Sequence, residues 1–403
     1  MRRKRAGLGV HQLTLVAMDA GPFGAKGEAL RGGGRRGEGL CRRAGEVSQP
    51  ISRRLVALKG VILAAGKGTR MLPLTERRPK PLVPVLDRPM VDHIVLGARD
   101  AGVDHLALVI DYLGEMIQER YGDGSALGLR IEYIWQAGAK GTGAATLLAA
   151  DFVGDEPFFL SWGDIIVAPE TYANVLRIWA EEQPDAILSL NWVADPWEGA
   201  AVYVDQAGYI ERIIEKPPRG QSTTNYNNAG IFVLRPEVFE VLRECPVSPR
   251  GEVEFPDAVK ALMARQRRIR GVEVIGYWSD VARPSAVLDL NSTITQFRSE
   301  DGIIVEAGAE VDPGATLTAP VFIGQGCRVG AAEIGPEVSL GPDTMVGAGA
   351  RLRRVATFGG SGIGEGCVLE NVIVEEGVTL AGANVAGTDE TPEAIPTPAG
   401  AGR

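Results

Sequence analysis

The chain has 403 residues, of which 45% are hydrophobic and 23% charged, a composition typical of a globular protein with two or three domains. No apolar run approaches the ~20 residues that a membrane-spanning helix needs, so we expect no membrane partner. The formal net charge of −9 argues against nucleic-acid binding as the main activity. The cysteines stand far apart without zinc-type spacing, which favours a reduced, cytoplasmic compartment; they are Cys41, Cys245, Cys327 and Cys367.

Residues 1–55 carry the opposite charge from the rest of the chain. They hold 12 lysines and arginines against 4 acidic residues, and they show no sustained hydrophobic period. A disordered extension and a basic arm for a membrane or a nucleic acid both agree with this composition, and of these two the composition favours the disordered extension. We therefore expect the first folded domain to begin near residue 56.

A glycine-rich loop follows the first apolar run of that domain. Val61-Ile62-Leu63 predicts a buried strand, and the turn from Gly66 to Arg70 comes directly after it. Successive N–H groups in such a turn form a concavity for anions, and Arg70 and Lys80 add cationic groups suited to phosphate. These features predict a triphosphate site; a tight strand–helix turn with surface cations is the structural alternative. The spacing matches neither a Walker A loop nor a dinucleotide fingerprint, which would require glycine at position 71.

Short apolar runs then alternate with helical patterns as far as residue 165. This alternation predicts βαβ units and a mostly parallel sheet, in which ligands bind beyond the carboxyl ends of the strands. The loop at 64–70 and Asp164 both follow strands and belong on that edge. The expected strands are 59–63, 105–110, 130–135 and 158–161, and the expected helices are 90–101, 112–121 and 143–150.

Two further segments of this sheet carry polar groups of interest. Gln136 ends the third strand, and the small residues after Lys140 open the next helix. Small residues there allow the close approach of a flat ring or a phosphate, with close helix–sheet packing as the alternative. Asp164 ends the fourth strand, where a carboxylate caps a helix or binds a metal ion.

The loop and the residues after it resemble a known signature. Leu63-Ala64-Ala65-Gly66-x-Gly68-Thr69-Arg70, followed by Pro79-Lys80-Pro81-Leu82-x-Pro84, closely resembles that of the sugar-1-phosphate nucleotidylyltransferases, or NDP-sugar pyrophosphorylases. The resemblance covers roughly residues 58–386. The first strand of this family usually lies at the N-terminus, so the resemblance also favours residues 1–55 being upstream sequence read from a misplaced start.

The resemblance implies a set of site residues. The nucleotide would be held by Leu63, Ala65, Gly66, Gly68, Thr69 and Arg70, and its base by Gln136, Gly141 and Thr142. Asp164 and Asp280, the latter in a Trp-x-Asp pattern, would share one Mg²⁺. The sugar phosphate would contact Gly163, Glu215, Lys216, Asn228 and Gly230, where Glu-Lys-Pro and Asn-Ala-Gly segments match the family. The catalytic set is Arg70, Lys80, Asp164, Lys216 and Asp280. Residues 251–258 resemble a further family segment but depart from it at Phe255-Pro256, and they receive no role.

The chain changes character after residue 300. Apolar residues recur in steps of five or six from 305 to 380, with Gly, Pro, Asp and Ala between them. This hexapeptide period predicts a parallel β-helix of roughly four to five coils, and it resembles the left-handed β-helices. Open coil ends favour a homo-oligomer. Residues 388–403, rich in Pro, Ala, Gly and Thr, predict a disordered tail.

Together these features predict an α/β fold, with a Rossmann-like, mostly parallel mixed sheet flanked by helices over 56–300 and a β-helix over 301–387. The resemblance implies Mg²⁺-dependent transfer of a nucleotidyl group from an NTP to a sugar 1-phosphate, by default glucose 1-phosphate with dTTP or UTP. Three alternatives stay open: a mannose-1-phosphate guanylyltransferase, a bifunctional enzyme with acetyltransferase activity, and a non-catalytic regulatory scaffold. The acetyltransferase alternative is disfavoured. Similar acetyltransferase sites generally use a histidine as the general base, and all three histidines, at 11, 93 and 105, lie outside the repeat.

Overall fold

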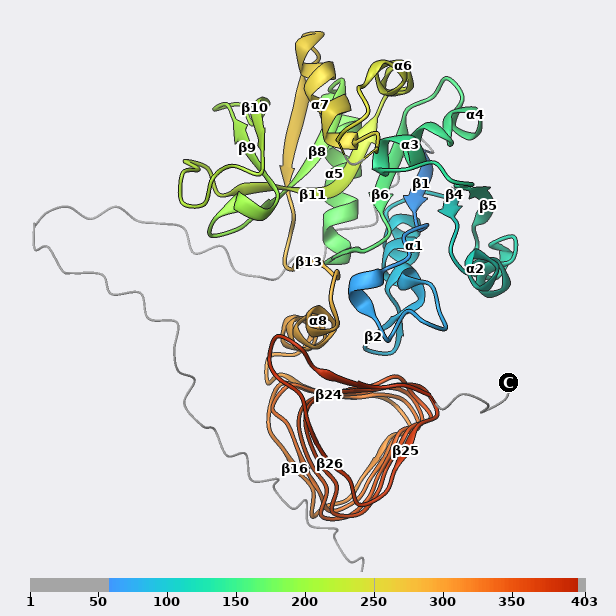
Figure 1. The fold of residues 1–403 in the computed structure, drawn as a ribbon, viewed down its shortest axis with the longest axis vertical. Helices are drawn as coiled ribbons and strands as arrows, with labels where there is room; N and C mark the ends of the chain where they lie inside the picture. Colours follow the sequence, from blue (N-terminus) through green and yellow to red (C-terminus); the bar gives the residue numbers. More distant parts are fainter. Residues whose placement is uncertain (1–57, 250, 398–403) are drawn as a thin grey trace, which may run out of the picture. The chain divides into compact units, whose positions relative to one another are not determined.

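The computed structural model describes residues 58–249 and 251–397. The basic extension expected over residues 1–55 lies outside the described residues. An α/β region comes first in the chain, and a β-helix follows it (Figure 1). Both belong to the same compact unit, residues 55–403. None of the helices in the described part of the chain is long and apolar enough to cross a membrane.

The α/β region is organised around a nine-stranded mixed sheet. Four strands run parallel in the order β6-β1-β4-β5; they are β1 (Lys59–Leu63), β4 (His105–Ile110), β5 (Arg130–Trp135) and β6 (Phe158–Trp162). β11 (Tyr226–Leu234) runs antiparallel to β6 and pairs with β8 (Ala186–Trp192), beside which lies β12 (Ile269–Glu273). The hairpin of β9 (Ala200–Val204) and β10 (Ile210–Glu215) joins the end of β11. The predicted α/β class is therefore confirmed.

Helices cover both faces of this sheet. Successive residues of each strand alternate between two apolar cores, so that Ile62 lies in one core and Val61 in the other. The first core also receives α1 (Met90–Asp100), α2 (Gly114–Tyr121), α5 (Pro169–Glu182) and α8 (Pro284–Arg298). The second receives α3 (Thr142–Leu147), α4 (Ala150–Val153), α6 (Glu237–Glu244) and α7 (Phe255–Ala264). Because both faces are covered, the parallel strands read as continuous apolar runs.

One predicted helix is divided in the structure. The sequence predicted a single helix over 143–150, but α3 ends at Leu147 and α4 begins at Ala150. Between them Ala149 has φ −84° and ψ 2°, which is the bridge region rather than the α region. The run of small residues carries no sequence signal for this break.

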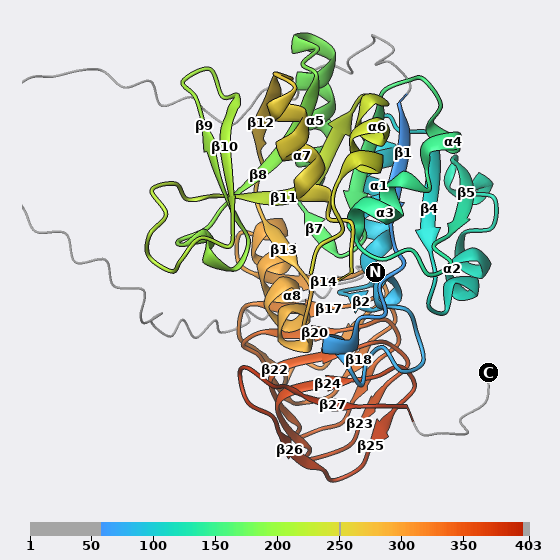
Figure 2. The ribbon, with the colours of Figure 1, turned by 45° about the horizontal axis from the view of Figure 1, so that its top comes forward.

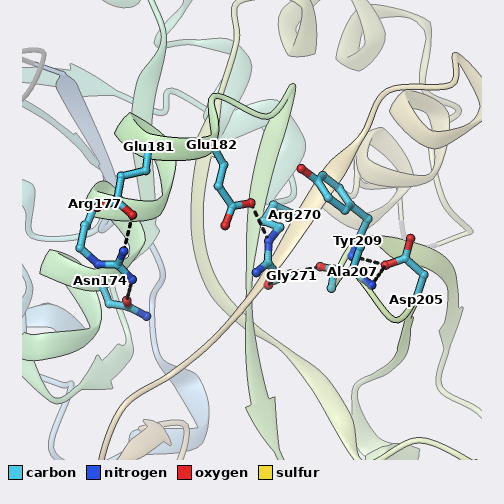
Figure 3. Close-up of polar contacts among 10 residues, drawn as sticks. Asn174, Arg177, Glu181, Glu182, Asp205, Ala207, Tyr209, Arg270 and Gly271 are labelled. Carbon is cyan, nitrogen blue, oxygen red and sulfur yellow. Dashed lines mark hydrogen bonds and ion pairs between the residues drawn. The ribbon is translucent and has the colours of Figure 1, made fainter.

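Arg270 on β12 fastens the β9–β10 hairpin to the sheet, as Figure 3 shows. Its guanidinium donates to the carbonyl oxygens of Gly208 and Gly271 at 2.9 and 2.6 Å, and its Nε lies 2.9 Å from the Glu182 carboxylate on α5. The hairpin turn is closed by Asp205, whose carboxylate accepts from the backbone N–H of Tyr209 at 2.8 Å. The Arg270 contacts hold the hairpin, which carries Glu215 at its end, against the central sheet, and the Asp205 contact fixes the turn itself.

Two small ladders lie outside the main sheet. β7 (Ile165–Val167) pairs antiparallel with β13 (Trp278–Asp280), and β2 (Pro84–Val85) pairs antiparallel with β3 (Arg88–Pro89). Short 3₁₀ turns precede the second ladder at Thr69–Met71 and Lys80–Leu82, and two more occur at Ser125–Leu127 and Pro196–Glu198. The β7–β13 ladder joins the end of β6 to a segment more than 100 residues later.

The C-terminal region is a three-sided parallel β-helix, seen in Figure 1 as a triangular outline and in Figure 2 as stacked coils. Strand partners stand 17 or 18 residues apart through most of the stack, as with Phe322 and Ser339, so each side spans about six residues. Inward side chains such as Val321, Ile323, Leu340 and Val355 form a separate core. The hexapeptide period is therefore confirmed.

We name the three sides by what lies on their outer surfaces. The docked side faces α8 and consists of β14 (Ile303–Val305), β17 (Val321–Ile323), β20 (Val338–Leu340), the second halves of β22 (Arg351–Thr357) and β24 (Val368–Val374), and β27 (Glu393–Ile395). The open side consists of β15 (Glu310–Val311), β18 (Arg328–Val329), β21 (Met345–Val346), β23 (Gly362–Ile363) and β25 (Thr379–Leu380). The charged side consists of β16 (Thr316–Leu317), β19 (Glu333–Ile334), the first halves of β22 and β24, and β26 (Asn384–Ala386).

Part of the expected disordered tail is ordered. Residues 393–395, which the sequence assigned to that tail, form β27 and pair with β24, with Ala394 opposite Ile373. The open edge of β24 supplies backbone hydrogen-bonding groups to any segment that reaches it, whatever that segment's composition. Composition alone therefore misplaced the end of the β-helix, and residues 398–403 lie outside the described residues.

Candidate functional site

The glycine-rich loop leaves the carboxyl end of β1, as predicted. Gly68 begins the turn Thr69–Met71 with a φ of 63°, and its carbonyl accepts from the Thr75 hydroxyl at 2.9 Å. A Cβ at Gly68 would lie 2.8 Å from the Cβ of Lys80, so the glycine permits the close approach of the lysine. Gly66, Thr69 and Arg70 are exposed, and a Cβ at Gly66 would meet no atom within 4 Å. The loop therefore borders open space at its tip.

Lys80 and Asp164 form the central contact of the site. The Lys80 side chain is only 9% exposed, and its Nζ donates to Oδ2 of Asp164 at 2.6 Å. Asp164 follows β6, and Gly163 before it donates its N–H to the carbonyl of Leu63 at 2.9 Å. A Cβ at Gly163 would lie 2.5 Å from that carbonyl oxygen, so a glycine is needed to bring the two strand ends together. Asp164 is thereby placed beside the glycine-rich loop.

Asp280 lies next to Asp164 because of the β7–β13 ladder. Asp280 pairs with Ile165, and the N–H of Val281 donates to the Asp164 carbonyl at 3.1 Å. Partial desolvation and the neighbouring Asp164 carboxylate raise the pKa of Asp280, while Lys80 and Arg70 act in the opposite direction. Arg70, Lys80, Asp164 and Asp280, predicted from segments more than 200 residues apart, are therefore brought together.

The two carboxylates suit a hard divalent cation. Magnesium is usually bound by one or two carboxylates together with water and substrate phosphate oxygens. Two facing carboxylates also repel each other, and a cation between them would remove this repulsion. No group of three or more His, Cys, Asp or Glu side chains arranged for a metal ion occurs in the described residues, so the protein side of such a site is limited to this pair.

The predicted base-binding segments pack on a part of the chain to which the sequence gave no role. Gln136 follows β5 and donates from Nε2 to the Ala139 carbonyl at 2.5 Å. A Cβ at Gly141, where φ is 93°, would lie 2.4 Å from the carbonyl oxygen of Val253. The Thr142 hydroxyl accepts from the N–H of Phe255 at 3.2 Å. Residues 252–255 thus brace the start of α3, and close packing accounts for Gly141.

The predicted sugar-phosphate residues lie on β10 and β11. Glu215 ends β10, and Lys216 follows with a φ of 44° and an N–H that donates to the Gly199 carbonyl at 2.7 Å. Partial desolvation raises the pKa of Glu215; nearby Lys260 and Lys216 oppose the rise. Asn228 accepts from the N–H of Gly230 at 2.9 Å. Within the described residues no hydrogen bond or ion pair joins Glu215 or Lys216 to the Asp164–Asp280 pair.

Two tryptophans at the site were not predicted as functional residues. The indole N–H of Trp278 donates to the Ala229 carbonyl at 3.0 Å and ties β13 to the Asn-Ala-Gly segment. Trp162 lies against Gly230, whose added Cβ would be 2.7 Å from the ring, and its indole N–H is buried without a hydrogen-bond partner among the described residues. The sequence signal was their position, two residues before each aspartate of the pair.

Comparisons with known proteins agree on one family. A family profile described as "Nucleotidyl transferase" matches residues 59–297. Among curated relatives, the glucose-1-phosphate thymidylyltransferase of Streptomyces griseus is 29% identical over 332 residues, 82% of this chain and 89% of that protein. The bifunctional protein GlmU of Methanococcus maripaludis is 33% identical over 272 residues, and the match covers 68% of this chain and 62% of that protein.

Solved structures show the same fold. A putative glucose-1-phosphate thymidylyltransferase from Bacillus anthracis, in complex with a sucrose, superposes with a TM-score of 0.54 and 27% identity, covering 58% of this chain and 94% of that one. A UDP-glucose pyrophosphorylase complexed with UDP-glucose gives a TM-score of 0.54 at 24% identity, covering 60% of this chain and 99% of that one. The shared part corresponds in extent to the α/β region.

Proposed function

Since the chain belongs to the nucleotidyl transferase family and is a sugar-1-phosphate nucleotidylyltransferase, we propose that its substrates are dTTP and glucose 1-phosphate and its products dTDP-glucose and pyrophosphate. Support for the substrates comes from the Streptomyces griseus relative, which matches over 82% of the chain and whose name specifies them. The putative Bacillus anthracis enzyme is named for the same reaction. Gln136 at the end of β5 agrees with this base, because an amide can both donate to and accept from thymine.

The observation that carries the proposal is the contact of Lys80 with Asp164, beside Asp280 and the glycine-rich loop. Asp164 and Asp280 would hold Mg²⁺, which when bound neutralises charge on the triphosphate oxygens. The exposed tip of the loop offers N–H groups to the triphosphate, and Arg70 stands beside them as a fork of donors. The two carboxylates, the two cationic side chains and the exposed loop then share one edge of the sheet.

The chemistry asks the protein for alignment and charge stabilisation. A phosphate oxygen of the sugar 1-phosphate attacks the α-phosphorus of dTTP, and a new P–O bond forms. The bond from the α-phosphorus to the oxygen bridging to the β-phosphate breaks, and pyrophosphate leaves with that electron pair. No proton transfer is required, because the attacking phosphate is already ionised. Arg70 and Lys80 would stabilise the leaving pyrophosphate, and Lys216 would guide the attacking phosphate.

The remaining predicted residues would orient the sugar. Glu215 accepts hydrogen bonds from sugar hydroxyls, and Asn228 and Gly230 line the same side through the start of β11. The Asn228 side chain already accepts from the Gly230 N–H, so it fixes that backbone before the sugar arrives.

The test is pyrophosphate release from a matrix of five nucleoside triphosphates, dTTP, UTP, GTP, CTP and ATP, against three sugar phosphates: glucose 1-phosphate, mannose 1-phosphate and N-acetylglucosamine 1-phosphate. Each combination is measured with Mg²⁺ and with EDTA. We expect the highest kcat/KM for dTTP with glucose 1-phosphate and no release in EDTA. A maximum for GTP with mannose 1-phosphate would replace the proposed substrates, and silence in every combination from folded protein would favour the regulatory scaffold.

A further inference from the structure

The segment that carries Lys80 is anchored to the β-helix on one side of the lysine. Two residues before it, the Arg78 guanidinium lies 3.7 Å from the Glu375 carboxylate, at the end of β24. The same guanidinium lies over the ring of Phe358, 5.4 Å from its centroid. The Glu375 side chain is only 3% exposed and that of Arg78 13%. The Glu375 carboxylate also accepts from the Thr397 hydroxyl at 3.4 Å, but of these two partners only Arg78 balances the buried charge, so Glu375 favours the observed position of Arg78.

A second anchor lies on the other side of the lysine, through α8. The Asn291 side chain accepts from the N–H of Leu86 at 2.9 Å and donates to the Ser339 hydroxyl at 2.6 Å. Asn291 and Ser339 are each only 4% exposed, so neither hydrogen bond is readily replaced by water. Ser339 belongs to β20 on the docked side of the β-helix. Leu86 is thereby tied to the β-helix by one amide side chain.

Between these two anchors the chain is short and internally bonded. The N–H of Val83 donates to the Lys80 carbonyl and the N–H of Leu82 to that of Pro79, at 3.0 and 2.9 Å. The Lys80 ammonium then reaches Asp164 at 2.6 Å. A lysine side chain has four rotatable bonds and little intrinsic precision. Its position here depends on a backbone segment whose two ends contact the β-helix directly or through Asn291.

We propose that the β-helix positions Lys80 for catalysis, with Glu375 and Ser339 as positioning residues that act through Arg78 and through Asn291. This inference rests on the proposed function for its catalytic consequence. It gives the β-helix a role inside the reaction of its own chain, because a misplacement of about 1 Å in a catalytic group lowers the rate by as much as 10²-fold. Both positioning residues lie outside the α/β region that the family profile matches.

Two variants in the β-helix test this role. Glu375→Gln removes the charge that holds Arg78, and Ser339→Ala removes the hydroxyl that accepts from Asn291. The matched control is Glu333→Gln, which removes a carboxylate 3.6 Å from Arg351 on the charged side, in an exposed ion pair. Ser339→Thr retains the hydroxyl and serves as the conservative variant. Each protein is measured for kcat and for the KM of both substrates, and for hydrogen–deuterium exchange of the backbone amides of residues 74–83.

We expect Glu375→Gln and Ser339→Ala to lower kcat about ten-fold while the KM values change less than about three-fold, and to speed exchange at residues 74–83 about ten-fold. Exchange in the β-helix core, at residues such as Val338 and Val355, should stay as in the unchanged protein. The control and Ser339→Thr should match the unchanged protein in both measurements.

Unchanged exchange at residues 74–83 in both variants would overturn the proposal, and so would faster exchange there with an unchanged kcat. If Glu375→Gln loosens the whole β-helix, Ser339→Ala decides alone, because it removes one hydroxyl and no charge. If the unchanged protein releases no pyrophosphate, the proposed function fails. The exchange measurement would still decide whether the β-helix holds the Lys80 segment, and a loss of activity could not be mistaken for a loss of anchoring.

Discussion

Charged side chains are arranged differently at the proposed catalytic edge of the sheet, which carries Asp164 and Asp280, and on the outer surface of the β-helix. On the β-helix, each of three acidic residues faces an arginine at the paired position of a neighbouring coil. The pairs are Glu310 with Arg328, Glu333 with Arg351, and Arg353 with Glu370. At the proposed catalytic edge, Asp164 is paired with Lys80 but also lies beside Asp280, and the like charge contributes to the raised pKa of Asp280.

The difference distinguishes ion pairs that only contribute to stability from charged groups that serve a ligand. An exposed ion pair between neighbouring coils contributes about 0.2–1 kcal/mol and can be lost with little consequence. Asp280 adds a second carboxylate beside the Lys80–Asp164 ion pair, and the like charge lowers the stability of the folded state, so folding alone gives no reason for the arrangement. Lys80 pairs with one of the two carboxylates, and the second negative charge of Asp280 beside it supports the proposal that this part of the molecule binds a ligand.

The strongest test of this comparison is Asp164→Asn. The amide keeps the size of the side chain and still accepts from Lys80, but it is a poor ligand for Mg²⁺. We expect kcat to fall about 10³-fold, in line with the loss of a group that stabilises transition-state charge. The circular dichroism spectrum should be unchanged. Turnover near that of the unchanged protein would refute the metal assignment.

Asp280→Asn sharpens the comparison, because it should lower activity and raise stability together. The folded pKa of Asp280 is raised, so the folded state binds more protons than the unfolded state, and this residue's contribution to stability falls as pH rises through that range. We expect kcat to fall about 10²-fold and the free energy of unfolding in EDTA, from urea titration, to increase. A less stable variant in EDTA would contradict this account.

His93 on α1 is an ionisable group outside the proposed site, and its substitution tests how a lowered pKa affects stability at acidic pH. Burial lowers its pKa, and its Nε2 lies 3.2 Å from the Val85 carbonyl. The unfolded state then binds more protons than the folded state below about pH 6.5, the ordinary pKa of histidine, so stability falls as pH falls. We expect the free energy of unfolding to drop less between pH 7 and pH 5 in His93→Gln than in the unchanged protein. Equal slopes would show that other groups cause the acid sensitivity.

The smallest effect is expected on the charged side of the β-helix. Glu333→Gln removes one partner of an exposed pair, whose side chains are both 66% exposed. We expect the free energy of unfolding to change by less than about 0.5 kcal/mol and kcat to stay the same. A loss above about 1.5 kcal/mol would mean that these pairs stabilise the stack and that the contrast with the catalytic edge is overstated.

The parts of the fold that the sequence predicted are those with strong local signals. β1, β4 and β5 begin and end at the predicted residues, because each is a strand of five or six residues bounded by turn residues. The β-helix followed from its six-residue period. β27 and the break before Ala150 were missed, since pairing with a distant edge and a local change in ψ leave no periodic signal.

The candidate site was predicted as residues and not as contacts. Residue chemistry assigned Lys80 to phosphate and placed Asp164 at the ligand edge of the sheet, and the resemblance assigned the aspartate to a metal ion. It did not indicate that the two side chains touch at 2.6 Å, or that Gly141 packs on Val253. Such contacts join residues 84 or more positions apart and depend on the ends of neighbouring strands. A single sequence does not encode those distances in any local pattern.

The regular stacking of the docked side also fixes the distance between the two anchors, because that distance is a whole number of strand spacings. Ser339 and Glu375 stand on the third and fifth strands of this side, and adjacent strands lie about 4.8 Å apart, so the two anchors are separated by about 10 Å along the stack. A coil gained or lost between them would leave the stack itself intact, because each coil contacts only its neighbours. It would displace Glu375 from Arg78 by one strand spacing, so the number of coils in that interval is fixed by the α/β region and not by the β-helix.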